Sequence, residues 1–313
     1  MNWRPTASVN ALQERAKLFA SIRQFFLQRQ VLEVDTPALS TYTGTDVNLG
    51  QFKTTEDYAL YTSPEFAMKR LLASGSGDIY QLSHVFRQDE VGQRHNPEFM
   101  MLEWYRCGWD EQQLMAEVIE LIQSLKGGSE LKPIMMSFEQ AFTLAGLPNP
   151  FEASLDMLRE AVLDKLNASA GNWSRDECLD ALMAMVIEPM LPADEPCFIH
   201  SYPRSQAALA QFGEFNQQPI ARRFELYWLG MELANGYFEL TDAHEQRKRF
   251  NEDAKLRIEK QLPAAVIDET LLAALEHGMP SCSGVALGVD RLMMILGQYG
   301  SISEVLPFDF TRV

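Results

Sequence analysis

Arg87, Arg94 and His95 stand close together in the stretch from Phe86 to Arg106, which reads FRQDEVGQRHNPEFMMLEWYR. A third arginine, Arg291, follows a glycine-rich run near the carboxyl terminus. Guanidinium groups are natural partners of phosphate oxygens. Because the chain has no G-x-x-x-x-G-K and no G-x-G-x-x-G motif, the common phosphate loops are absent. A phosphate site would depend on Arg87, Arg94, His95 and Arg291, and the alternative for each arginine is solvation or an ordinary ion pair.

An acidic residue follows within an otherwise apolar segment, FMMLEWY. If this segment is a strand, Glu103 shares one face with Phe99, Met101 and Tyr105, and the other face is apolar. A buried carboxylate is costly unless it has a cation or a hydrogen-bond donor beside it. The simplest interpretation is a structural ion pair with an arginine of a neighbouring strand. The alternative is a site for a substrate cation.

The segment ELANGYFEL repeats this pattern, since alternation places Asn235, Tyr237 and Glu239 on one face. If the two faces coincide on one sheet, Glu103 and Glu239 form a small acidic box beside Tyr105. Such a box suits a primary ammonium group. The sequence therefore predicts a site for an amine as well as a phosphate site.

Two further carboxylates, Glu225 and Glu232, lie seven residues apart with Gly230 between them. Mg²⁺ is commonly held by one or two protein carboxylates together with substrate phosphates, so this pair is a candidate magnesium site. Phe99 offers a flat ring for a purine, although a phenylalanine after Pro-Glu is more often part of the core.

Composition limits the function classes. The 313 residues carry a formal net charge of −16, which disfavours an extended nucleic-acid-binding surface. No apolar stretch of about 18 residues and no apolar leader occurs, so we expect a cytoplasmic protein without a membrane span. The four cysteines form no C-x-x-C pair, and we expect structural, reduced thiols at Cys107, Cys178, Cys197 and Cys282.

The elements that must position these residues can be predicted from periodicity. Helices are indicated over residues 8–30, in SPEFAMKRLLASG and from Asp110 to Leu125. Strands are indicated in DIYQLSHVFR, EFMMLEWYR, PCFIHSY and RRFELYWLGMELANGYFEL. Because many consecutive strands lack helical crossovers, we expect an α+β fold with an antiparallel β-sheet flanked by helices. We expect a single catalytic domain over residues 1–313, with a mainly helical insertion at about 127–196.

Three segments, VLEVDTPAL, VFRQDEVGQRHNPEF and GVALGVDR, resemble motifs 1, 2 and 3 of the class II aminoacyl-tRNA synthetases. TSPEFAMKRL and ELANGYFELTDAHEQ are similar to the lysyl branch, and the resemblance runs from about residue 10 to the carboxyl terminus. Lysyl-tRNA synthetases also carry an amino-terminal anticodon-binding β-barrel, for which this chain has no room. The resemblance is therefore to free-standing lysyl-type catalytic domains that modify a lysine of elongation factor P, and tRNA is not the expected acceptor.

The resemblance implies ATP-dependent activation of (R)-β-lysine, with α-lysine as a poorer substrate, and transfer to elongation factor P. It implies that Arg87 and Arg291 are catalytic and that Glu225 and Glu232 bind Mg²⁺. The implied ATP-binding residues are Arg87, Gln88, Asp89, Arg94, His95, Asn96, Phe99, Glu232, Leu233, Gly288 and Arg291. The implied amino-acid-binding residues are Ser63, Pro64, Glu65, Glu103, Tyr105, Asn235, Glu239 and Ala286. Motif 1 forms the dimer interface in the family, so a twofold homodimer is expected.

Two positions depart from the family pattern. Asp89 stands where the family usually has Glu, so the neighbouring Glu90 is an alternative partner for the adenine amino group. Ala286 replaces a glycine of the lysyl-tRNA synthetases, and its methyl group would favour an amino group in a shifted position. One methyl group discriminates by only about 1–3 kcal/mol.

Three rival functions remain open. They are a minimal tRNA-charging enzyme, a small-molecule amide ligase related to ammonia-dependent asparagine synthetase, and a non-catalytic synthetase paralogue. The second would need a basic residue at position 103 or 239 to bind a side-chain carboxylate, and both positions are Glu. The third does not explain why Arg87, Phe99, Glu232 and Arg291 occur together.

Overall fold

The computed structural model describes residues 3–42, 44–47, 49–56, 58–128 and 130–313. The chain divides into two compact units, each described here by itself. Unit 1 comprises residues 1–129 and 240–313, and unit 2 comprises residues 130–239. The insertion predicted at about 127–196 falls in unit 2 from residue 130 onward, and the single-domain assignment stays a prediction.

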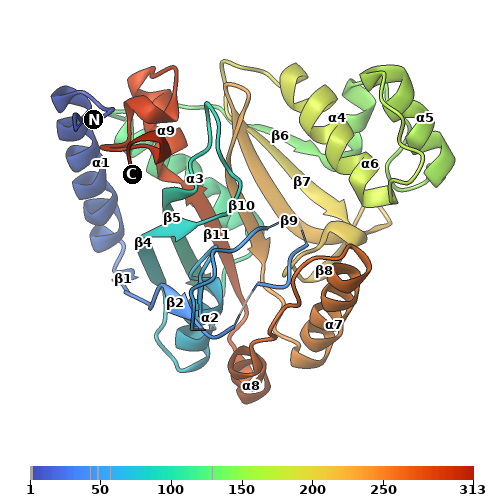
Figure 1. The fold of residues 1–313 in the computed structure, drawn as a ribbon, viewed down its shortest axis with the longest axis horizontal. Helices are drawn as coiled ribbons and strands as arrows, with labels where there is room; N and C mark the ends of the chain where they lie inside the picture. The colour runs from blue at the N-terminus through green and yellow to red at the C-terminus, as the bar shows by residue number, and fades with distance from the viewer. Residues whose placement is uncertain (1–2, 43, 48, 57, 129) are drawn as a thin grey trace. The chain divides into compact units, whose positions relative to one another are not determined.

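Unit 1 contains a sheet with the strand order β1-β4-β5-β11 (Figure 1). Its strands are β1 Leu32–Glu33, β4 Ile79–Phe86, β5 Glu98–Cys107 and β11 Cys282–Gly288, and a separate two-stranded sheet pairs β2 Leu39–Ser40 with β3 Ala59–Leu60. Its helices are α1 Val9–Gln28, α2 Glu65–Ala73, α3 Glu111–Leu125, α7 Ala243–Glu259, α8 Glu269–Gly278 and α9 Val289–Gly297. The β4–β5 and β5–β11 pairs are antiparallel, whereas β1–β4 is parallel.

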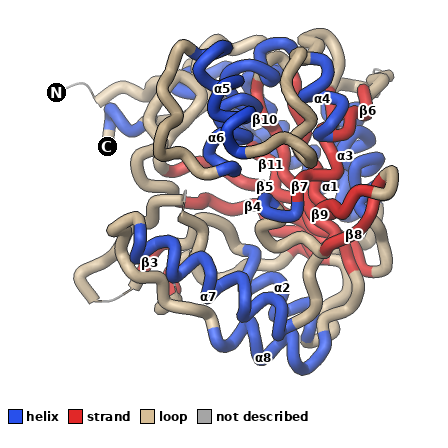
Figure 2. The backbone as a smooth tube through the Cα atoms, turned by 90° about the vertical axis from the view of Figure 1, so that its right-hand side faces the viewer, coloured by secondary structure: helices blue, strands red, loops and turns tan. Residues whose placement is uncertain are grey.

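The helices of unit 1 begin where the sequence supplies caps. Ser8 accepts a hydrogen bond from the backbone of Ala11 at the start of α1, and Asp110 forms a reciprocal capping box with Gln113 at the start of α3. Figure 2 shows α2, α7 and α8 side by side. All three helices predicted in this part of the chain are confirmed, to within one or two residues at each end.

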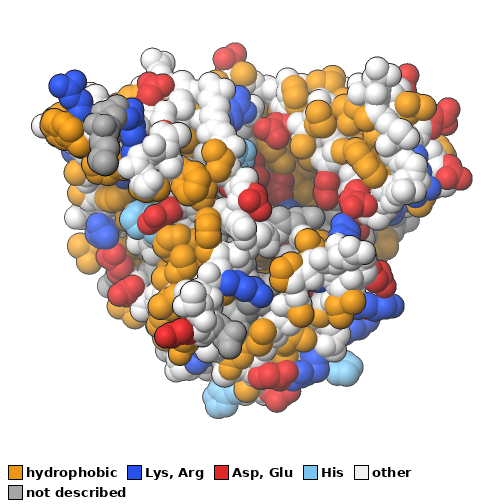
Figure 3. Space-filling model, in the orientation of Figure 1, with side chains coloured by type: hydrophobic (Ala, Val, Ile, Leu, Met, Phe, Trp, Pro, Cys, Tyr) orange, Lys and Arg blue, Asp and Glu red, His pale blue; other side chains and the backbone are white. Residues whose placement is uncertain are grey.

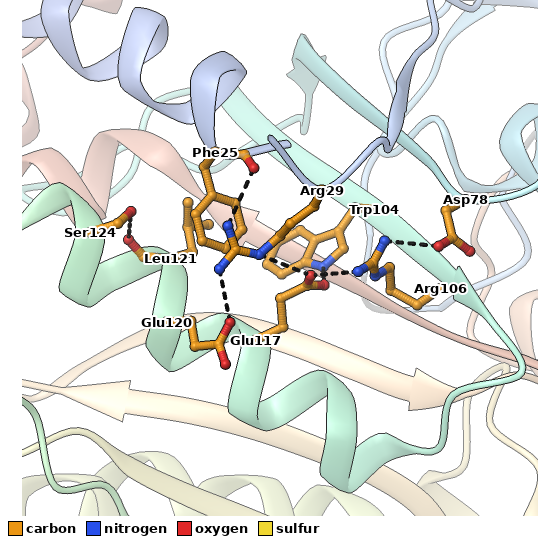
Figure 4. Close-up of polar contacts among 9 residues, drawn as sticks. All are labelled: Phe25, Arg29, Asp78, Trp104, Arg106, Glu117, Glu120, Leu121 and Ser124. Atoms are coloured by element: carbon orange, nitrogen blue, oxygen red, sulfur yellow. Dashed lines mark hydrogen bonds and ion pairs between the residues drawn. The ribbon is translucent and has the colours of Figure 1, made fainter. Parts of the chain in front are cut away.

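One face of β5 packs against α1 and α3. Trp104 contacts Phe26 of α1 at a ring-centroid distance of 5.5 Å and donates a 3.0 Å hydrogen bond to Glu117 of α3. Glu117, only 2% exposed, also lies 3.0 Å from Arg106 and 3.7 Å from Arg29 (Figure 4). This buried ionic cluster links the end of α1, the middle of α3 and strand β5.

Unit 2 contains strands in the order β10-β9-β7-β6, with β8 paired to β9. They are β6 Ile134–Ser137, β7 Cys197–Pro203, β8 Phe212–Phe215, β9 Gln218–Trp228 and β10 Met231–Phe238. Its helices are α4 Phe138–Leu144, α5 Leu155–Leu166 and α6 Arg175–Leu182, and the side chains of Ser154 and Ser174 cap the starts of α5 and α6. A two-residue turn with positive φ at Leu229 and Gly230 joins β9 to β10.

The fold is α+β, as expected, but the strands are not all antiparallel. Both β1–β4 and β6–β7 are parallel pairs, so the strand arrangement is mixed. β6 was not predicted because its residues, IMMS, lie in the stretch interpreted as helical insertion. A four-residue strand is too short to show a clear period.

On the face drawn in Figure 3, Lys and Arg side chains are scattered among acidic and apolar ones. The side chains coloured there form no continuous basic stripe. The four cysteines are free thiols, as expected. In the part of the chain that the structure describes, no helix combines the length and apolar character that crossing a bilayer requires.

Candidate active site

Glu103 is the centre of a buried polar cluster in unit 1, with a side chain 2% exposed. Tyr105 donates a 2.6 Å hydrogen bond to its Oε1, and Ser63 donates a 2.7 Å hydrogen bond to its Oε2. The hydrogen-bond partners described for Glu103 are thus two hydroxyls, not an arginine. The predicted alternation of β5 is confirmed, and the structural ion pair with an arginine is not what the structure shows.

Burial raises the pKa of Glu103 to about 7, and the nearby Glu65 carboxylate acts in the same direction. The hydrogen bonds from Tyr105 and Ser63, together with the charge of Lys69, oppose this rise in pKa. The two hydroxyls occupy two of the roughly four acceptor sites of a carboxylate. Glu103 therefore keeps acceptor capacity for an ammonium group, whose positive charge would favour its ionised form.

The segment that leads into α2 holds Glu65 next to this cluster. Ser63 accepts a 3.0 Å hydrogen bond from the backbone N–H of Glu65 while it donates to Glu103, and Pro64 is the residue before the helix. The side chain of Glu65 lies 2.6 Å from the ammonium of Lys69, one turn further along α2. The structure thus brings Ser63, Glu65, Glu103 and Tyr105 together, as predicted.

Sequence reasoning missed Lys69. Its side chain is 2% exposed, an unusual location for a lysine. The signal was present, because Lys69 follows Glu65 by four residues in a predicted helix and lies between Met68 and the apolar Leu71 and Leu72. A lysine on the apolar side of a helix, one turn after a predicted substrate-binding carboxylate, indicates a buried ion pair.

Three arginines converge on His95. Burial lowers the pKa of His95, and the positive charges of Arg291, Arg87 and Arg94 lower it further. Arg291, in the first turn of α9, donates a 3.2 Å hydrogen bond to the backbone oxygen of Arg94. These three arginines therefore lie near His95 within unit 1, and a phosphate site formed by them stays a prediction.

Arg87 lies directly after β4, and its guanidinium stands 5.1 Å from the ring centroid of Phe99. It also lies 3.5 Å from Glu90. The neighbouring Asp89 has a positive φ of 68°, and the backbone N–H of Gln88 donates a 2.9 Å hydrogen bond to the carbonyl of Gly50. The contacts of these residues with a nucleotide stay predictions.

Both polar atoms of the Asn96 side chain form hydrogen bonds within unit 1. Its amide nitrogen donates a 2.6 Å hydrogen bond to the carbonyl of Glu98, and its amide oxygen accepts a 2.9 Å hydrogen bond from the backbone N–H of Phe310. Asn96 therefore anchors the carboxyl-terminal segment to the loop between β4 and β5. A direct contact with phosphate stays a prediction.

The start of α9 is fixed from two sides. Asp290, 1% exposed, forms an ion pair with Arg15 of α1 and accepts a 2.8 Å hydrogen bond from the backbone N–H of Met100. This arrangement holds the residue next to Arg291 against both α1 and β5. On β11, Ala286 lies directly opposite Glu103 and Gly288 lies opposite Met101.

Unit 2 places the predicted magnesium ligands on one face of its sheet. Glu232 is the cross-strand partner of Tyr227, which is two residues from Glu225 on β9, so the two carboxylates share a face. Glu225 accepts a 2.7 Å hydrogen bond from Tyr202, another from Tyr227, and pairs with Arg223. These three donors leave little acceptor capacity on Glu225, and Mg²⁺ binding by Glu225 and Glu232 stays a prediction.

The other predicted residues of unit 2 lie on β10 and directly after it. Asn235 donates a 2.9 Å hydrogen bond to the hydroxyl of Tyr237, which confirms that these two share a face. Glu239 is 1% exposed and pairs in an isolated bridge with Ala210. Its predicted meeting with Glu103 joins residues of different units and stays a prediction. No group of three or more acidic, histidine or cysteine residues suited to a metal occurs among the described residues.

Comparison with known proteins identifies the family of this chain. The family of class II tRNA synthetases (D, K and N) matches residues 1–312. A protein of Pseudoalteromonas translucida named "Elongation factor P--(R)-beta-lysine ligase" is 46% identical over 99% of this chain and 98% of its own length. Proteins of the same name from Edwardsiella ictaluri and Photorhabdus laumondii are 47% and 45% identical over the same shares. The chain belongs to the class II tRNA synthetase family.

Proposed function

We propose that this protein is an ATP-dependent ligase that activates (R)-β-lysine and transfers it to the ε-amino group of a lysine of elongation factor P. The observation that carries this proposal is the buried Glu103, whose two oxygens are held by Ser63 and Tyr105 beside a second carboxylate, Glu65. A site built this way favours a substrate with amino groups. The names of the relatives, which match almost the whole chain, support the identity of donor and acceptor.

The reaction has two steps. In the first, a carboxylate oxygen of the amino acid attacks the α-phosphorus of ATP, the bond to the bridging oxygen breaks, and pyrophosphate leaves. Arg87 stabilises the negative charge that develops on the α-phosphate, and Arg291 holds the terminal phosphate. Arg94 and His95 add positive charge and donors beside them. Burial and the arginines lower the pKa of His95, which favours the neutral imidazole before ATP binds.

In the second step, the neutral ε-amine of the acceptor lysine attacks the carbonyl carbon of the aminoacyl-adenylate. An amide bond forms, AMP leaves with the electrons of the broken C–O bond, and the nitrogen loses a proton. No side-chain nucleophile is needed, since correct positioning of the two reactants accounts for much of the rate enhancement. Bound Mg²⁺ would neutralise phosphate charge, with Glu232 and, through its remaining acceptor capacity, Glu225 as ligands.

We also propose a twofold homodimer built on α1 and the segment through Pro37. Leu27, Leu32 and Leu39, in or near this segment, are each more than half exposed in the single chain, and a partner subunit would cover them. Static light scattering at micromolar concentration tests this, and a monomer contradicts it. A cytoplasmic location, where translation factors act, stays part of the proposal.

The deciding experiment measures AMP release from ATP with (R)-β-lysine, α-lysine or aspartate, in the presence and absence of purified elongation factor P. We expect (R)-β-lysine to give the fastest release, α-lysine a slower one and aspartate none, with a matching mass increase on elongation factor P. Labelling of tRNA by α-lysine would instead indicate a minimal tRNA synthetase. Failure of every amino acid to exchange pyrophosphate into ATP would indicate a non-catalytic paralogue.

A further inference from the structure

Lys69 is a buried ammonium inside a site that is proposed to receive ammonium groups. Its side chain is 2% exposed, and its Nζ lies 2.6 Å from Oε1 of Glu65. Removing a charged ammonium from water is costly, and a paired carboxylate offsets that cost only in part. A lysine in this location therefore indicates a role that a well-packed apolar residue could not provide.

Lys69 is one of three charged groups that influence one another. Glu65 and Lys69 belong to α2, and Glu103 belongs to β5, with Ser63 hydrogen-bonded to both the Glu103 side chain and the Glu65 backbone. Two neighbouring carboxylates in a buried site resist being ionised together, and one tends to take up a proton. A fixed positive charge beside them counteracts this tendency.

We propose that Lys69 is a positioning residue for amino-acid binding, whose buried ammonium orients Glu65 and favours the ionised form of Glu103 so that both carboxylates can receive substrate amino groups. This inference rests on the proposed function. Lys69 itself does not contact the substrate in this arrangement. Its effect reaches the amino acid through the two carboxylates.

The surroundings of Glu103 within unit 1 are consistent with this role. The largest contributions from other groups to its pKa come from Glu65 in one direction, and from Tyr105, Ser63 and Lys69 in the other, and Lys69 is the cation that this set of described residues contains. Gln81 and Ala286 are its uncharged cross-strand neighbours on β4 and β11. Glu103 also raises the pKa of the nearby Tyr61 hydroxyl, although burial is the larger cause.

The test counts the protons released when (R)-β-lysine binds, by titration calorimetry at pH 7 in buffers of different ionisation enthalpy. With a pKa of about 7, Glu103 is about half protonated in the free enzyme, so binding should release about half a proton from it. In Lys69→Met the release should rise toward one proton. The KM for (R)-β-lysine should rise several-fold at pH 7, and its pH profile should move up by about one unit, with kcat little changed.

Three further variants separate a charge effect from a packing effect. Lys69→Arg keeps the charge and should retain the wild-type proton count. The double variant Glu65→Gln/Lys69→Met removes both a cause that raises the pKa of Glu103 and one that lowers it, so its pH profile should return toward that of the wild type, even though affinity falls. Lys248→Met changes an exposed lysine near Glu245 and Glu252 on α7 and should alter nothing.

A wild-type proton count and pH profile in folded Lys69→Met would overturn the inference and leave Lys69 a structural residue. If Lys69→Met does not fold, the double variant Glu65→Gln/Lys69→Met provides the test. A pH profile of KM displaced by one pH unit from that of the wild type in the double variant would also overturn the inference. Absence of any (R)-β-lysine binding by the wild-type protein would overturn the proposed function and this inference together. The two failures are thus distinguishable.

Discussion

Tyr105 and Glu103 lie two residues apart on the same face of β5, and the Tyr105 hydroxyl donates a 2.6 Å hydrogen bond to Oε1 of Glu103. Because residues two apart on a strand share a face, this contact can be predicted from the local sequence without knowledge of the rest of the fold. A hydrogen bond to a carboxylate favours the ionised form and lowers its pKa. Tyr105 therefore helps to keep Glu103 negatively charged in a buried place.

We expect Tyr105→Phe to move the pH dependence of the KM for (R)-β-lysine to higher pH. The hydrogen bond that opposes the raised pKa of Glu103 is lost, so a larger fraction of Glu103 is protonated at pH 7 and cannot pair with an ammonium. Rates of AMP release between pH 5.5 and 9 measure this. Tyr61→Phe is the matched control, because the Tyr61 hydroxyl bonds to Ser83 and Gln81 instead. An unchanged profile in Tyr105→Phe would contradict the assignment.

Glu103 should also reduce stability where it is ionised. Its pKa in the folded protein is about 7, above the ordinary value of 4.5, so the folded state binds the proton more tightly than the unfolded state. The contribution of this group is therefore most favourable below about pH 4.5, declines as pH rises to about 7, and is constant above that. Glu103→Gln should be more stable than the wild type at pH 8, by up to about 3 kcal/mol.

Urea unfolding at pH 5 and pH 8 tests this effect. The advantage of Glu103→Gln should be clearly larger at pH 8 than at pH 5, while its AMP release with (R)-β-lysine is strongly reduced. Equal differences at both pH values would show that Glu103 has an ordinary pKa in the folded protein. A gain in stability with a loss of activity is the usual result when a site residue is held in an unfavourable environment.

Much of the site could be predicted because its residues follow local rules. Alternation placed Glu103 and Tyr105 on one face, and residue type alone predicted that Arg87, Arg94 and Arg291 would serve one anionic group. The contacts that were missed join distant parts of the chain. Asn96 bonds to the backbone of Phe310, and Arg15 pairs with Asp290, and no local period connects either pair. Helical spacing could have predicted the pairing of Lys69 with Glu65, but the burial of Lys69 depends on how α2 packs.

The ionic cluster on the opposite face of β5 should affect stability without affecting the chemistry. In Glu117→Gln the charge between Arg29 and Arg106 is lost while both arginines remain (Figure 4). Removing one partner of a buried ion pair costs about 3 kcal/mol. Burial raises the pKa of Glu117 and offsets part of this cost, so we expect a net loss of up to about 3 kcal/mol in the free energy of unfolding. Amino-acid-dependent AMP release per folded molecule should stay close to that of the wild type.

Glu120→Gln is the control for that variant. Glu120 lies on the same helix as Glu117, and its side chain is 2.9 Å from that of Arg29. The Glu120 side chain, however, is 57% exposed. Exposed ion pairs contribute little, so we expect a change of less than about 1 kcal/mol. Similar losses in both variants would show that burial does not set the importance of Glu117.

Ala286 should influence which lysine isomer is activated. It lies directly opposite Glu103 in the pairing of β11 with β5, so its methyl group stands beside a carboxylate that is proposed to receive a substrate amino group. In Ala286→Gly the added space should favour α-lysine, raising its kcat/KM relative to that of (R)-β-lysine by about 10- to 200-fold, as expected for one methyl group. Competition between the two isomers in AMP release measures the ratio.

Because glycine also loosens the strand, a matched Ala234→Gly change at a buried position of β10 controls for a general loss of order. If both variants change the ratio equally, the methyl group of Ala286 has no specific part in substrate choice. A change confined to Ala286→Gly would show that this single position sets the preference for a shifted amino group.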